Sequence, residues 1–423
     1  MATHASRFDA LVRKTFQNKF GIRKDLGDAA QLSLSLPIRR GGFGLRSAEQ
    51  ASIPAYYCAL TLAAPAILSI VPASRRKELL GAGSTQVPFA KELSRCWATL
   101  FAQGLPSGVD GLIPETPGEV WQPNSGVLAD PGRQRTICGF LHDAALQEFL
   151  RNTANGLRDR QRLTSASCPN AGAWLSALPC LPALTISDAT MAAAVRHRLG
   201  LPAADDLPAT CPCGSSLRED SSHFHSCQLT RRHAVTLRHD LVVRALRDLF
   251  HQVGAEVEVE HRVSGTVRQR PDLQIHFESG SYWVDVTVAH PCAPSRKYAR
   301  PLAAASDAEG KKFRDYGALA LQYNATFLPF ALESHGAFGT RAQEILQIIR
   351  KAAGNSVSGG GRAGGFRCLR RPETRRGPAA RQRGHCEAGR RGSACGGSPG
   401  RTGPRPGLAG PSRHSGTVAG VVC

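Results

Sequence analysis

The chain has 423 residues, 42% of them hydrophobic, and a formal net charge of +20 with a pI near 9.9. This length allows two or three domains with at least one apolar core, which excludes a wholly disordered protein. The excess positive charge favours a polyanionic partner, because neutralising phosphates releases condensed counterions. We see no continuous apolar run of about 18 residues and no cleavable leader, so we expect an intracellular protein without a membrane span.

The first part of the chain is expected to be helical. Residues 1–60 read as a polar helix, a glycine-marked tight turn at 36–46 and a helix rich in small residues. From 61 to 205 the pattern is mainly helical, with proline-rich interruptions near 105–132. Ser187 and Asp188 are natural N-caps for a helix that continues to Leu199.

A mixed pattern follows from 235 to 353, which predicts an α/β or α+β domain. The expected elements are a helix at 238–253, strands at 257–263, 273–277 and 282–289, a helix at 303–323, a strand at 326–332 and a helix at 342–351. The strands at 273–277 and 282–289 are joined by a short turn at 278–281, so we expect them to pair antiparallel.

The last segment, 354–423, differs from everything before it. It holds 13 Arg and 2 Glu with no Lys or Asp, so +11 of the net charge lies there. A segment of Gly, Pro, Arg and Ala cannot bury enough surface to offset chain entropy, and we expect disorder. GC-rich DNA translated out of frame gives the same composition, so the tail is either a basic nucleic-acid-binding arm or out-of-frame sequence.

Most cysteines occur singly in apolar surroundings, where a reduced thiol behaves as a small hydrophobe. These are Cys58, Cys96, Cys138, Cys168, Cys180 and Cys292. Cys211, Cys213, His223 and Cys227 instead form a C-x-C-x9-H-x3-C cluster within 206–234. Three thiolates and one imidazole suit tetrahedral Zn²⁺, and a four-ligand site is structural because it leaves no open position for water. His225 is a competing ligand, and the alternative is a chance cluster in a loop.

Two carboxylates suggest a second metal site. Asp272, in Arg-Pro-Asp, lies thirteen residues before Asp285, which places both at or in the antiparallel strands. Such a pair can share Mg²⁺ or Mn²⁺ for phosphodiester hydrolysis. The apolar residues Val284, Val286 and Val288 predict a buried strand, where an unpaired carboxylate is costly. The alternative is that Pro-Asp merely starts a strand and Asp285 is a satisfied core residue.

A cation is also needed, to offset charge on the phosphate, and its source is ambiguous. Thr287 stands two positions after Asp285, where the commonest restriction-type pattern has lysine. Lys311 or Lys312 is therefore the expected catalytic lysine, with Lys297 as a further alternative.

Several motifs in order resemble the region downstream of the polymerase in non-LTR retrotransposons that encode a restriction-like endonuclease. They are the turn at 36–46, Gly-Ala-Trp-Leu-Ser-Ala-Leu-Pro at 172–179, Arg-Leu-Gly-Leu-Pro at 198–202, the Cys/His cluster, Arg-His-Asp at 238–240, Arg-Pro-Asp-Leu at 270–273, Asp-Val-Thr-Val-Ala-His-Pro at 285–291 and Pro-Phe at 329–330. The resemblance covers about residues 1–350.

The resemblance implies a division of the chain. Its parts are a polymerase thumb-like remnant (1–60), a helical linker (61–205), a zinc knuckle (206–234), a restriction-endonuclease-like mixed-sheet domain (235–353) and the tail (354–423). It also implies that Asp272 and Asp285 bind metal, that a nick in target DNA primes copying of element RNA, and that the protein is nuclear. The only Asp-Asp pair, Asp205–Asp206, follows Ala-Ala in a proline-flanked loop, so we expect no polymerase activity and a truncated reading frame.

Three hypotheses follow. The chain is a Mg²⁺-dependent DNA endonuclease, a non-catalytic zinc-dependent nucleic-acid-binding module, or a decayed transposon relic. The sequence does not indicate the DNA target or the oligomeric state.

Overall fold

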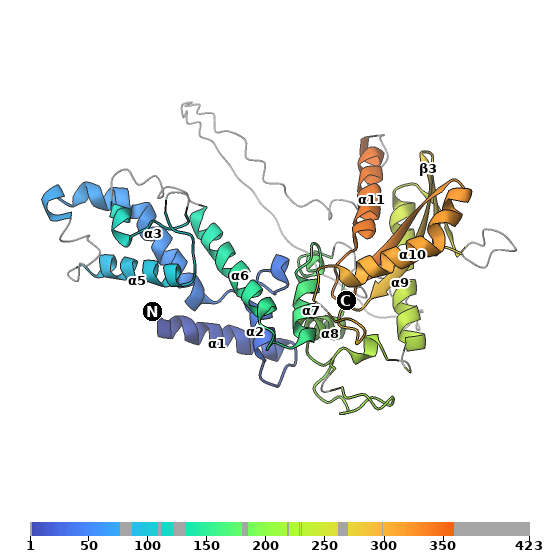
Figure 1. Ribbon diagram of the computed structural model, residues 1–423, viewed down its shortest axis with the longest axis horizontal. Coiled ribbons are helices and arrows are strands. Elements are labelled where there is room, and N and C mark those ends of the chain that lie inside the picture. The colour runs from blue at the N-terminus through green and yellow to red at the C-terminus, as the bar shows by residue number, and fades with distance from the viewer. Residues whose placement is uncertain are drawn as a thin grey trace, which may run out of the picture.

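Helices make up the first part of the chain, and a four-stranded sheet covered by three helices makes up the second (Figure 1). The computed structural model describes residues 2–76, 87–108, 111–121, 132–179, 185–217, 220–227, 229, 231–260, 270–297 and 299–358. Cys180, residues 261–263 of an expected strand, and residues 359–423 of the expected tail lie outside the described residues. Residues 354–358, which we expected to be disordered, instead continue the last helix, Thr340–Ser358. The fold is mixed α+β, as expected.

The N-terminal helices agree with the expected helical pattern. They are α1 (Ala2–Lys19), α2 (Asp28–Ser35), α3 (Ala48–Ile70), α5 (Pro88–Ala102), α6 (Arg133–Arg151), α7 (Leu157–Ala166) and α8 (Asp188–Leu199). The expected glycine turn joins α2 to α3, with Gly41 at φ 83° where a side chain would be strained. Ser187 caps α8, accepting a hydrogen bond from Thr190 N at 3.3 Å, while Asp188 lies in the first turn.

Helix α3 has the length and apolar composition of a membrane span, the one helix among the described residues that does. Tyr57 and Ala64 are fully buried, and they belong to a core shared with Leu93 and Leu100 of α5 and Ile137 of α6. Core helices have this composition too, so the feature alone does not indicate a membrane.

The sheet has the order β1-β2-β3-β4. Its strands are β1 (Glu256–Val259), β2 (Leu273–Phe277), β3 (Gly280–Ala289) and β4 (Ala325–Glu333). β1–β2 and β2–β3 are antiparallel, as expected for the second pair, whereas β4 pairs parallel to β3 through a helical crossover. Pro329, which cannot donate to a ladder, is tolerated because β4 lies at the edge of the described sheet.

The three helices of this part are α9 (Arg231–Gln252), α10 (Ala303–Gln322) and α11 (Thr340–Ser358). Val284 and Val286 of β3 face a core shared with α9 and α11. Trp283, one position earlier, packs instead with Ala320 of α10. Because side chains alternate along a strand, Asp285 lies on the α10 face with Trp283.

Helix α10 is held in place by a buried carboxylate. Glu333, at the end of β4, accepts hydrogen bonds from Ala304 N at 3.0 Å and Ala305 N at 3.3 Å, so it caps the N-terminus of α10. Its other oxygen accepts a hydrogen bond from Ser165 Oγ of α7 at 2.5 Å. This carboxylate therefore ties the helical part to the sheet part.

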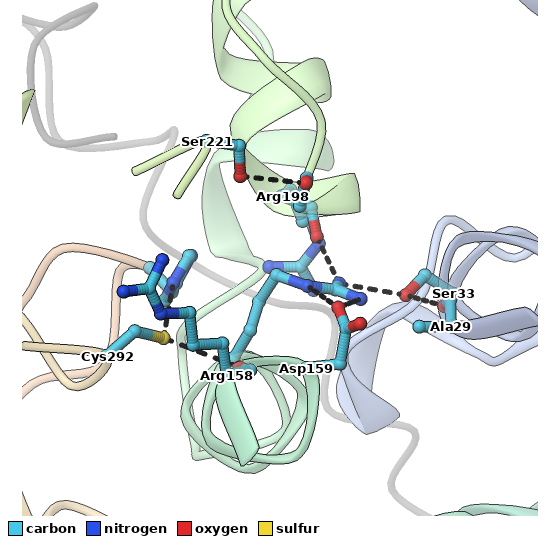
Figure 2. Close-up of polar contacts among 10 residues, drawn as sticks. Ala29, Ser33, Arg158, Asp159, Arg198, Ser221 and Cys292 are labelled. Carbon is cyan, nitrogen blue, oxygen red and sulfur yellow. Dashed lines mark hydrogen bonds and ion pairs between the residues drawn. The ribbon is translucent and has the colours of Figure 1, made fainter. Parts of the chain in front are cut away.

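A buried guanidinium organises the junction between α2, α7 and α8. Arg162 Nη1 donates to Arg198 O at 2.6 Å and to Ser33 Oγ at 3.1 Å, and Nη2 pairs with Asp159 at 3.0 Å. Figure 2 shows Ser33, Asp159 and Arg198 converging at this point. Burying a charge is costly without such partners, so the three helices must keep their spacing.

Four histidine rings form a second junction, which we call the histidine joint: His197 of α8, His225, His290 after β3 and His335 after β4. His197 stacks on His335 with centroids 4.3 Å apart, and His225 stacks on His290 at 4.6 Å. His290 bonds Ser334 Oγ through Nδ1 at 2.7 Å. Burial lowers the pKa of His197 to about 4 and that of His290 to about 3, so both rings are neutral near pH 7.

Replacing the buried arginine should destabilise the chain. Arg162→Ala leaves Arg198 O and Ser33 Oγ without their donor, and we expect a loss of roughly 2–4 kcal/mol in the free energy of unfolding. Urea denaturation measures it. The exposed Arg151→Ala is the matched control, expected to change stability by less than about 1 kcal/mol; equal losses in both variants would contradict the role given to Arg162.

Acid should weaken the histidine joint. Since the folded pKa values of His197 and His290 lie below the ordinary 6.5, the unfolded chain binds more protons as the pH falls. The stabilisation is complete above pH 6.5 and is lost as the pH falls from 6.5 to about 3. His335→Phe keeps a ring to stack on His197 but removes a buried titrating group, so its unfolding free energy should fall less between pH 7.5 and 5.0 than that of the wild type. Identical losses would refute this account.

Candidate functional site

The first two zinc ligands lie on a small hairpin turn. Thr210 and Ser216 form an antiparallel bridge, and Cys211 N donates to Ser215 O at 2.8 Å. Gly214, at φ 88°, takes a left-handed conformation that glycine adopts without strain. The turn thus brings the side chains of Cys211 and Cys213 toward one point.

The other two ligands lie on the turn Asp220–Cys227, which we call the zinc turn. It contains the short helix η6 (His223–His225), and Cys227 N donates to His223 O at 2.9 Å, so the two residues lie on one helical turn. Cys213 Sγ lies 3.0 Å from His223 Nε2, and Cys211 Sγ lies 3.7 Å from Cys227 Sγ.

These four residues could hold a zinc ion. Their ligand atoms all lie within 4.8 Å of one another. The Cys211–Cys227 sulfur separation of 3.7 Å matches the edge of a tetrahedron with Zn–S bonds of about 2.3 Å. Three sulfurs and one imidazole nitrogen are the donor set that zinc prefers, so the residues fit the ion.

His225, the competing ligand, lies elsewhere. Its Nδ1 accepts a hydrogen bond from Arg238 Nη1 at 2.6 Å, and its ring stacks on His290. Burial, and then the neighbouring histidines and Arg238, lower its pKa well below the ordinary value. His225 belongs to the histidine joint and is not part of the ligand group.

The two candidate catalytic carboxylates lie beside each other at one end of the sheet. Leu273, the first residue of β2, pairs with Val284 of β3, so Asp272 lies just beyond this pairing, beside Asp285. Asp272 Oδ2 accepts a hydrogen bond from Val286 N, the residue after Asp285, at 2.6 Å. Burial, and then the negative charge of Asp272, raise the pKa of Asp285.

Lys312 of α10 reaches this pair. Its Nζ lies 2.6 Å from Asp285 Oδ2, and the carboxylate is only 3% exposed. Carboxylate oxygens are the ligands that Mg²⁺ and Mn²⁺ prefer, so a buried carboxylate beside a second carboxylate fits a divalent cation that would replace the lysine as its partner.

His239 of α9 holds the other carboxylate. Its Nε2 lies 2.9 Å from Asp272 Oδ2, and the same oxygen accepts a hydrogen bond from Val286 N at 2.6 Å. The bond to Asp272 raises the pKa of His239 to about 9, so the ring is charged at neutral pH. With both donors on Oδ2, the second oxygen of Asp272 stays available to a ligand.

Tyr316 completes the wall of the site on α10. Lys312 Nζ lies 5.7 Å from its ring centroid, within range of a cation–π contact. Its hydroxyl donates to Arg270 O at 3.2 Å. Burial, and then the charge of Asp285, raise the pKa of Tyr316 to about 12, so the hydroxyl keeps its proton.

The structure brings Asp272, Asp285 and Lys312 together and leaves the other candidate lysines, Lys311 and Lys297, exposed. Asp205 pairs with Arg196 at 2.9 Å, which is a structural contact. His239 and Tyr316 were missed by the sequence analysis. The motif Arg-His-Asp at 238–240 contains His239, but the motif was noted only as part of a resemblance. Nothing in the sequence indicated a role for Tyr316.

No model of a known protein family matches the chain, and no curated protein is similar to it.

Zinc content tests the four-ligand group. Purified wild type should contain one zinc per chain, and Cys213→Ser should lose it because serine oxygen is a poor zinc ligand. Cys138→Ser, which changes a half-buried thiol outside the group, is the control and should keep its zinc. Elemental analysis by mass spectrometry measures both, and stoichiometric zinc in Cys213→Ser would rule out this ligand set.

Proposed function

We propose that this protein is a metal-dependent DNA endonuclease that nicks one strand. The observation that carries the proposal is the convergence of Asp272, Asp285 and Lys312, with the Asp285 carboxylate almost wholly buried and paired with Lys312 Nζ at 2.6 Å. Two negative charges in adjacent strands destabilise the fold unless cations neutralise them, so such an arrangement suggests a functional site.

Each residue has a role in this mechanism. Asp272 and Asp285 would hold Mg²⁺ or Mn²⁺, which supplies Lewis-acid stabilisation of the phosphate and an acidified water. Lys312 would move from ion pairing with Asp285 to offset the charge that develops on the phosphate oxygens. His239 would hold Asp272 in its ligating orientation through the bond at 2.9 Å. Tyr316, a hydroxyl at neutral pH, would help to keep Lys312 in place.

The biological setting we propose is that of a non-LTR retrotransposon protein lacking a polymerase site. The order of motifs along residues 1–350 supports it, together with the net charge of +20, which favours nucleic acid as the partner. In that setting the nick would prime copying of element RNA in the nucleus, and the zinc knuckle would help to hold nucleic acid. A non-catalytic binding module and a transposon relic are the alternatives.

Plasmid nicking tests the proposal. The full chain should convert supercoiled DNA to the open-circular form with Mg²⁺ or Mn²⁺, and Asp272→Asn, Asp285→Asn and Lys312→Met should each lower the rate at least about 100-fold. The cation should be withheld rather than chelated, because a chelator would also strip zinc. DNA binding, measured by fluorescence anisotropy, should survive in all three variants.

Lys311→Met is the matched control, since it removes an exposed lysine one position away and should retain near wild-type nicking. Loss of activity in Lys311→Met but not in Lys312→Met would contradict the assigned site. Salt-sensitive DNA binding without nicking, from folded and zinc-loaded protein, would support the binding module instead.

A further inference from the structure

The zinc turn contacts both parts of the chain. On the helical side, Asp220 pairs with Arg158 of α7 at 2.8 Å, and Ser221 Oγ donates to Gly200 O at 2.9 Å. Figure 2 shows Arg158 and Ser221 at this junction. On the sheet side, Ser222 Oγ bonds His290 Nε2 at 3.0 Å. The zinc turn is thus wedged between α7, α8 and the end of β3.

His225 carries the contact from the zinc turn to α9. It lies in the sequence between two candidate zinc ligands, His223 and Cys227. Its Nδ1 accepts from Arg238 Nη1 at 2.6 Å, and the other amino group of Arg238 donates to Val288 O of β3 at 3.4 Å. A guanidinium can only donate, so this bond needs the unprotonated nitrogen that His225 presents.

The next residue on α9 is His239, which bonds Asp272 at 2.9 Å. A continuous series of contacts therefore runs from the zinc ligands through His225 and Arg238 to the carboxylate pair. Arg238 is half-buried, and its guanidinium bonds both His225 Nδ1 and Val288 O, so it links the zinc turn to the end of β3.

We infer that the zinc turn positions the carboxylate site, with His225 and Arg238 as the positioning residues, so that zinc loading strengthens divalent-cation binding at Asp272 and Asp285. The inference rests on the proposed function for the identity of the second site. It gives the zinc knuckle a role inside the nuclease, separate from holding nucleic acid. The coupling is reciprocal, because zinc and the divalent cation both favour the same arrangement of the chain. Binding of either ion should therefore strengthen binding of the other.

Two variants of His225 separate the hydrogen bond from packing. His225→Asn keeps an acceptor oxygen near the position of Nδ1 but loses the ring that stacks on His290. His225→Phe keeps a ring but loses the acceptor. If the bond to Arg238 carries the coupling, His225→Asn should bind Mn²⁺ nearly as tightly as the wild type, and His225→Phe should bind it more weakly. If only packing matters, His225→Asn should be the weaker of the two variants.

The experiment measures Mn²⁺ affinity by electron paramagnetic resonance on the full zinc-loaded chain, with Asp285→Asn marking the signal that belongs to the carboxylates. His225→Phe should retain one zinc per chain yet bind Mn²⁺ about 10-fold or more weakly, the usual effect of losing a residue that orients a metal ligand. The zinc-free wild type should show a similar loss of Mn²⁺ affinity. His251→Asn, an exposed histidine on the same helix, is the control and should match wild type.

Amide hydrogen exchange provides a readout that does not depend on nuclease activity. Zinc removal and His225→Phe should speed exchange along α9 and at the end of β3 while leaving α5 unchanged. Unchanged Mn²⁺ affinity and unchanged exchange in His225→Phe would overturn the coupling even in an active nuclease. If zinc removal and His225→Phe speed exchange in α9 but the wild type does not nick DNA, the coupling is supported and the proposed function is contradicted.

Discussion

The repulsion between two carboxylates requires positive charge beside the sheet, and the sheet part of the chain is arranged to supply it. Asp272 lies just before β2 and Asp285 lies in β3, and Asp285 is almost wholly buried. Positive charge has to come from outside the sheet, because the strands themselves offer none at that end. Helix α10 supplies Lys312 from one side, and α9 supplies His239 from the other. The placement of both helices is therefore linked to the electrostatics of one strand pair.

Several junctions around the site are polar. Glu333 joins the start of α10 to Ser165, Arg162 joins α2, α7 and α8, and four histidines fill the space between the zinc turn and the ends of β3 and β4. Polar junctions have directional contacts, so they fix the relative placement of elements more strictly than an apolar contact of the same area does. A site that needs charges a few ångströms apart benefits from that strictness.

Local signals in the sequence were enough for β2, β3 and β4 to within two residues and for the Cys/His group, whereas the strand expected at 257–263 ends at Val259, because Glu260 takes a positive φ of 49°. The alternation of Leu273 and Ile275 with polar neighbours predicted both ends of β2 correctly. The spacing of the cysteines and the histidine predicted the Cys/His group. The sequence alone could not predict whether Lys311 or Lys312 contacts Asp285. The answer depends on how α10 is placed over β3, and the start of α10 is capped by Glu333 of another strand, β4. The roles of His225 and His239 depend on contacts between distant segments, which spacing does not encode. The β3 strand also begins earlier than expected, at Gly280, since the hairpin turn is tighter than 278–281.

The parallel crossover from β3 through α10 to β4 has a consequence for synthesis of the chain. Parallel pairing needs the whole connection to be available before the strands can join, so such contacts form late. A nascent chain that has not yet emerged from the ribosome beyond Glu333 has no β4 and no cap for α10, and Lys312 then has no fixed place opposite Asp285. The carboxylate site would thus stay incomplete on unfinished chains, so the nuclease activity proposed for it would begin only after β4 has joined the sheet.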